Sequence, residues 1–205
     1  MRRRAAARLL RLLSLVPGPD MTAAYGAALS ATGLFEAEDV MEELVETGPL
    51  QATFTGRYQL HDLLRLFARA RLSREETPDE REAAEDRLRT WLLDTAVVAG
   101  RWYKPGYGAP PSSWQGQVPL DTAEQARTWL QSEAPAWLAA LRGAAHRGEH
   151  TQVVETADAM EWFCDLWVFC SGGTGQGSSA CPARPPPHST TRTCGPSTST
   201  ATPGH

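Results

Sequence analysis

The large apolar side chains of this sequence end abruptly at residue 170, and this boundary limits what can fold. Residues 171–205 contain no Leu, Ile, Val, Met, Phe, Tyr or Trp and consist mostly of Ser, Thr, Pro and Gly. Such a segment cannot bury enough apolar surface to offset the entropy of ordering it. We therefore expect a folded part in residues 1–170 and a disordered tail over residues 171–205.

The composition also suggests an origin for this tail. The chain has no Ile and no Asn, and Lys104 is its single Lys, a usage typical of GC-rich bacterial coding DNA. Such DNA read out of frame gives mixtures of Pro, Arg, Ser, Thr, Cys and His. We hypothesise that the tail is a frameshift product and that the ancestral chain continued as further helices.

Residues 1–76 have the element order of a winged-helix domain. Apolar residues at helical spacing predict helices over about 3–16, 22–31 and 37–47, separated by Pro and Gly. Two strand-like runs around Thr55-Gly56 then predict a β-hairpin. A further helix begins near His61, and its apolar stripe consists of Leu63, Leu64, Leu66, Phe67 and Ala70.

Residues 77–170 are typical of helices alone. Thr77-Pro78-Asp79-Glu80 and Asp121-Thr122-Ala123-Glu124 are helix-start signals, and Pro135 must kink or divide the helix in which it lies. We interpret the tryptophans of this region as packing residues between helices: Trp91, Trp102, Trp129, Trp137, Trp162 and Trp167. The fold class is therefore mainly α, with domains at 1–76 and 77–170 before the tail.

Charge and hydropathy exclude several classes of protein. The net charge of −4 gives no basic footprint for nucleic acid. The predicted third helix and its approach carry six carboxylates and no Arg or Lys, which argues against DNA as a partner of this helix. No run approaches the roughly 20 apolar residues that a membrane span needs. Arg8 and Arg11 interrupt the N-terminal leucines, so we expect an amphipathic helix and a cytoplasmic protein rather than a signal peptide.

No constellation of catalytic residues is discernible. Cys164, Cys170, Cys181 and Cys194 match no zinc-binding spacing, and we expect no metal site. The Gly-rich run at residues 172–177 lacks the Lys of a P-loop. We therefore expect that this chain is not an enzyme and holds no cofactor by itself.

The most informative short element is His61-Asp62, at the junction of a predicted strand and a predicted helix. Unpaired backbone N–H groups at a helix N-terminus attract anions. A His at this point can donate a hydrogen bond to a phosphate, and the adjacent Asp can orient the imidazole or cap the helix. The local chemistry also fits a simpler interpretation, in which Asp62 is only a cap and His61 a surface residue.

Three segments resemble one known family. They are ARLLRLLSLVPGPD at residues 7–20, RYQLHDLLRLFA at 57–68 and WLQSE at 129–133. The first two resemble the winged-helix domain of actinobacterial STAND-class regulators, the NB-ARC signalling ATPases. The second corresponds to the family's Met-His-Asp motif, with Leu60 in place of Met, and the third to the start of its tetratricopeptide-like helical region. The Pro135-Ala136-Trp137 stretch departs from the usual pattern. The similarity covers about residues 5–168.

The resemblance implies a regulatory role. In this family the winged-helix His contacts the β-phosphate of bound ADP and holds a two-state switch closed, so His61 and Asp62 become the candidate cofactor-binding residues. The P-loop and Walker B strand of the family precede the winged helix and are not in this sequence. ADP or ATP would then bind only with a nucleotide-binding domain supplied in trans, and the helical region would contact other proteins. Two alternatives stay open: a free-standing winged-helix DNA-binding regulator and a non-functional truncated remnant.

Overall fold

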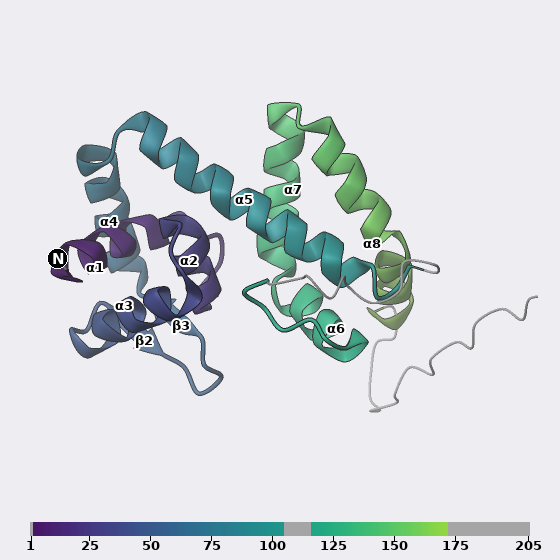
Figure 1. The fold of residues 1–205 in the computed structure, drawn as a ribbon, viewed down its shortest axis with the longest axis horizontal. Helices are drawn as coiled ribbons and strands as arrows, with labels where there is room; N and C mark the ends of the chain where they lie inside the picture. Colours follow the sequence, from purple (N-terminus) through teal and green to yellow (C-terminus); the bar gives the residue numbers. More distant parts are fainter. Residues whose placement is uncertain (1, 105–115, 172–205) are drawn as a thin grey trace, which may run out of the picture.

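The computed structural model describes residues 2–104 and 116–171. Within these residues the fold is mainly α, with one small antiparallel sheet, as the sequence predicts (Figure 1). The elements are α1 (Arg2–Leu13), β1 (Asp20–Met21), α2 (Ala23–Ser30), α3 (Leu34–Glu46), β2 (Leu50–Ala52), β3 (Tyr58–Leu60), α4 (Asp62–Glu75), α5 (Pro78–Gly100), α6 (Ala123–Ser132), α7 (Ala134–Arg147) and α8 (His150–Ser171). The predicted disorder of residues 172–205 lies outside the described residues.

The first six elements follow the helix–strand–helix–helix–strand–strand order of a winged helix. The predicted hairpin is confirmed: β2 and β3 pair antiparallel, with Leu50 opposite Leu60. The pattern did not predict β1, whose two residues pair with β3 in the sheet order β1-β3-β2. A two-residue strand after Pro-Gly-Pro has no local signal, because its pairing with β3 comes from a segment almost 40 residues away.

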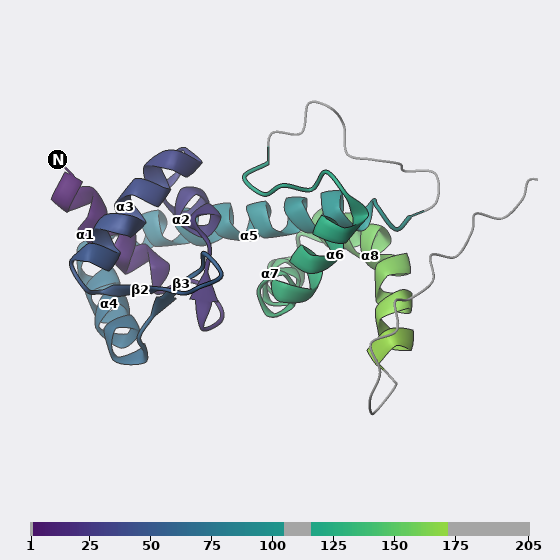
Figure 2. The same ribbon diagram turned by 90° about the horizontal axis from the view of Figure 1, so that it is seen from below.

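Helix α5 connects two groups of helices (Figures 1 and 2). The first group is α1–α4 with the small sheet, and the second is α6–α8. Its predicted start is confirmed as a capping box, in which the Thr77 hydroxyl accepts from the Glu80 backbone N–H and the Glu80 carboxylate accepts from the Thr77 backbone N–H. The helix packs against α2 on one side and against α7 and α8 further along. The predicted division near Pro135 is also confirmed, since α6 ends at Ser132 and α7 begins at Ala134.

Trp162 contradicts an expectation about burial, and the apolar stripe of α4 faces mostly outward. Leu63, Leu66 and Phe67 are exposed at 71%, 67% and 58%, whereas Leu64 is partly buried against the core. Ala68 and Leu72 are the buried residues of α4. Trp162 is also exposed, at 41%, whereas Trp129 and Trp137 are buried as expected. The side chain of Trp167 lies outside the described residues.

Candidate functional site

His61 lies between β3 and α4 and is the N-cap of α4. Its imidazole Nδ1 accepts a hydrogen bond from the backbone N–H of Leu63, at 3.3 Å, and the side chain is exposed. In a neutral imidazole with an accepting Nδ1, the proton is on Nε2. The cap therefore selects the tautomer that has a donor at Nε2, which is the form that can bind a phosphate oxygen.

The cap is formed by His61 and not by Asp62, so the predicted Asp62 cap is wrong, whereas His61 lies on the surface as the simpler interpretation has it. Asp62 is the first residue of α4 and is exposed. Its carboxylate acts on Arg65: partial burial lowers the pKa of Arg65, and the negative charge of Asp62 opposes this shift. A carboxylate in the first turn also interacts favourably with the helix dipole. Asp62 thus contributes to the charge balance at the start of α4.

The position of His61 is fixed from both sides. Leu60, the residue before it, is buried and pairs with Leu50 in the hairpin. On the helix side, the Arg65 guanidinium donates to the Val16 carbonyl at 2.7 Å and ties α4 to the segment after α1. At the far end of α4, Arg11 of α1 contacts the buried Glu76 carboxylate at 2.7 Å. The strand–helix junction that carries His61 is thus tied to both β2 and α1.

An exposed apolar surface adjoins His61 on α4. It consists of Leu63, Leu66 and Phe67, which we call the α4 outer face. These positions are three and four residues apart, so they lie on one side of the helix. Arg71 extends over the Phe67 ring, with its guanidinium carbon 5.9 Å from the ring centroid. Exposed apolar residues gathered on one side of a helix are typical of a protein-contact surface. Periodicity did not identify this surface, because it does not tell a core-facing stripe from an outward one.

Helix α3 has the opposite character. Five of its carboxylates are exposed, and the helix contains no Arg or Lys; the exposed residues are Glu36, Glu38, Asp39, Glu42 and Glu46. Desolvation and the charges of Glu38 and Glu42 raise the pKa of Tyr58 in the neighbouring strand β3. This electrostatic field would repel a polyanion, which argues against duplex DNA as a ligand of this helix.

The part of the chain that the structure describes also bears on metal, membrane and groove sites. That part contains no group of three or more His, Cys, Asp or Glu side chains arranged to hold a metal ion. Its helices include none that is long and apolar enough to cross a membrane. A shallow groove of about 580 Å³ runs along α5, lined by residues that include Asp86, Trp91, Asp94 and Gln117. It contains neither His61 nor Asp62.

Comparison with known proteins gives two relatives, both from Streptomyces. The chain is 38% identical over 149 residues to the regulatory protein AfsR of Streptomyces coelicolor and, to the same extent, to the regulatory protein AfsR of Streptomyces griseus. These matches cover 69% and 70% of this chain but 15% of each relative. No family model and no solved structure matches the chain. The chain is therefore homologous to one part of the AfsR regulatory proteins.

Proposed function

We propose that this chain is a non-catalytic regulatory module in which the winged helix gates the nucleotide state of a P-loop domain supplied in trans. In the closed state, the partner domain holds ADP, and His61 contacts the ADP β-phosphate. The observation that carries the proposal is the placement of an exposed, tautomer-selected His61 directly beside the α4 outer face. The homology to regulatory proteins and the resemblance to STAND-class regulators support the same assignment.

The chemistry of the junction suits a phosphate. Backbone N–H groups of the first turn of α4 and the helix dipole both favour an anion. The Nε2–H of His61 adds one directed donor. A single hydrogen bond contributes only about 1 kcal/mol net, or about 2 kcal/mol to a charged acceptor. The partner domain must therefore supply most of the nucleotide affinity, and His61 supplies the difference between the ADP-bound closed state and the open state.

The α4 outer face gives the winged helix a surface with which to dock. Full burial of a Leu or Phe side chain stabilises a complex by about 1.5–3 kcal/mol, so the three residues together contribute on the order of 5 kcal/mol before the cost of association. This supports a weak and reversible contact. A ligand that changes the contact by a few kcal/mol can then shift the balance between closed and open states.

A titration with a purified P-loop domain of this family tests the proposal. We expect the chain to bind the ADP-loaded domain and to bind the ATP-loaded domain more weakly. Leu66→Gln should weaken binding about tenfold or more, because it places an amide in the buried part of the contact. Phe35→Gln is the matched control, since Phe35 is an exposed apolar residue on α3. Equal loss in both variants, or no binding by the wild-type chain, would refute the proposal.

A further inference from the structure

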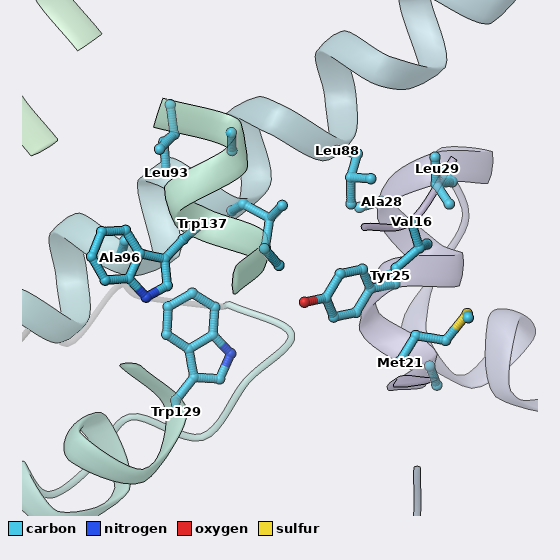
Figure 3. Close-up of a cluster of buried hydrophobic side chains, with 14 of the residues drawn as sticks. Val16, Met21, Tyr25, Ala28, Leu29, Leu88, Leu93, Ala96, Trp129 and Trp137 are labelled. Atoms are coloured by element: carbon cyan, nitrogen blue, oxygen red, sulfur yellow. The ribbon is translucent and has the colours of Figure 1, made fainter. Parts of the chain in front are cut away.

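A buried carboxylate joins the winged helix to the helices that follow. Glu133 lies between α6 and α7 and is only 3% exposed. One of its oxygens accepts a hydrogen bond from the Tyr25 hydroxyl of α2, and the other accepts from the Arg57 guanidinium, which precedes β3. Figure 3 shows the Tyr25 hydroxyl directed from α2 toward Trp129 of α6. These contacts connect residues that are 76 and 108 positions apart.

Arg57 connects the carboxylate of Glu133 to the sheet. Its Nε and Nη2 atoms donate to one oxygen of Asp20 in β1, at 2.9 and 2.8 Å, while Nη1 donates to Glu133. Tyr25 completes the group as a neutral donor, because burial and the charge of Glu133 raise its pKa. The four side chains (Asp20, Tyr25, Arg57 and Glu133) form what we call the latch. It satisfies both Glu133 oxygens only when the hairpin and α2 occupy their present positions.

The local sequence explains why Glu133 points at the winged helix. Pro135 has no backbone N–H and cannot continue the hydrogen bonding of α6, so the chain turns at Glu133. Trp129, one turn earlier, makes an edge-to-face contact with Trp91 of α5, with the ring centroids 6.5 Å apart. Trp91 makes the same kind of contact with Tyr25, with centroids 5.1 Å apart. Tyr25 belongs to the latch, and the two tryptophan rings pack beside it. The polar contact therefore lies within an aromatic interface between the two groups of helices.

We propose that the latch is a conformational device that couples the β2–β3 hairpin to helices α6 and α7. Displacement of the hairpin would then release α6 and α7 from the winged helix. The reason is the cost of an unpaired charge. If the hairpin moves, Arg57 leaves Glu133 and a carboxylate stays buried without its cation, which is strongly unfavourable. The two groups of helices must then separate far enough for water to reach Glu133. The latch therefore has two arrangements, one formed with Glu133 paired and one broken with Glu133 exposed to water, and no stable intermediate between them.

Hydrogen–deuterium exchange of the full chain tests this coupling. Tyr25→Phe keeps the ring contacts and removes one donor, and Glu133→Gln removes the charge. We expect each variant to speed exchange of the α2 and the α6–α7 amides together by about tenfold, the size of a typical coupling between contacting residues. Exchange in α8 should not change. Glu149→Gln is the matched control for loss of a charge pair: Glu149 pairs with the buried Arg89 away from this interface, so its effect should stay near α7 and α8 and not reach α2.

The double variant distinguishes coupling from ordinary destabilisation. If the latch acts as a unit, Tyr25→Phe adds little to the exchange rates of Glu133→Gln, so the two effects are not additive. Additive effects, or faster exchange confined to the element that carries the substitution, would overturn the proposal. Tyr25→Phe is conservative enough to keep the test decisive if Glu133→Gln does not fold. In that case, unchanged α6–α7 exchange in Tyr25→Phe would overturn it. The test does not depend on the proposed nucleotide gate.

Discussion

Gly100 allows α5 and α8 to cross closely, and replacing it with Ala should destabilise the protein. A Cβ atom built on Gly100 would lie 2.9 Å from the carbonyl carbon of Ala159 and closer still to the Ala159 carbonyl oxygen and the Met160 methyl group. Nonbonded carbon atoms prefer about 3.5–4.0 Å. The Met160 side chain can move aside, but the Ala159 backbone belongs to α8. Relief therefore requires the two helices to separate by about 1 Å.

The magnitude follows from two opposing effects. Overpacking a closely packed interior costs about 1–3 kcal/mol. Inside a helix, replacing Gly with Ala stabilises the folded state by up to about 1 kcal/mol through helix propensity. Gly100 is the last residue of α5, so the benefit at this position is smaller. We expect Gly100→Ala to lower the free energy of unfolding by about 2 kcal/mol. For a folded part of this size, this corresponds to a fall in Tm of about 4–8 °C.

Gly143→Ala is the control for this comparison. Gly143 lies inside α7, and a Cβ there would meet only the Arg89 side chain at 3.7 Å, an ordinary contact. Gly143→Ala should therefore show the whole stabilisation that Ala gives over Gly in a helix, about 1 kcal/mol, as a rise in Tm of about 2–4 °C. Thermal and urea unfolding followed by circular dichroism at 222 nm measure both variants. If Gly100→Ala were as stable as the wild type or more so, the close crossing of α5 and α8 would be wrong.

Three further predictions address other parts of the molecule. Thr77→Ala removes the cap of α5 and should cost about 1 kcal/mol in urea unfolding; no loss would contradict the capping box. Asp94→Asn should raise Tm at neutral pH, because desolvation and the Glu155 charge raise the pKa of Asp94 and disfavour its ionised form in the folded state. The gain should shrink as the pH falls through that raised pKa and disappear below the ordinary pKa of an Asp; a gain that is constant with pH would refute this cause. Leu66→Gln should change the stability of the isolated chain by less than about 0.5 kcal/mol, because its side chain is exposed, and a larger loss would show that it packs in the core.

Local signals predicted much of the fold. The hairpin around Thr55-Gly56, the cap at Thr77 and the helix division near Pro135 depend on a few neighbouring residues, and the structure confirms each of them. Strand β1 was missed because it exists through its pairing with β3. The mainly α fold with a small hairpin was accessible from the sequence because helical spacing and turn residues are short-range properties.

The candidate site was only partly accessible. The motif located His61 at a strand–helix junction, but which of two adjacent residues caps a helix depends on the backbone, and His61 has the extended ψ of 140°. Helical spacing revealed the apolar stripe of α4 but not the direction in which it faces. The latch had no signal in a single sequence, since Tyr25, Arg57 and Glu133 come together only in the folded chain.

The rate of ADP release from the P-loop domain of a STAND-class regulator is the most direct test of the proposed gate. A fluorescent ADP analogue is bound to the domain, the chain is added in excess, and release is started by unlabelled nucleotide. We predict that the wild-type chain slows release, that His61→Ala removes most of this effect, and that His146→Ala, which alters an exposed His at the end of α7, retains it. If release were equally slow with the wild type and His61→Ala, His61 would not contact the nucleotide and the gate would be contradicted.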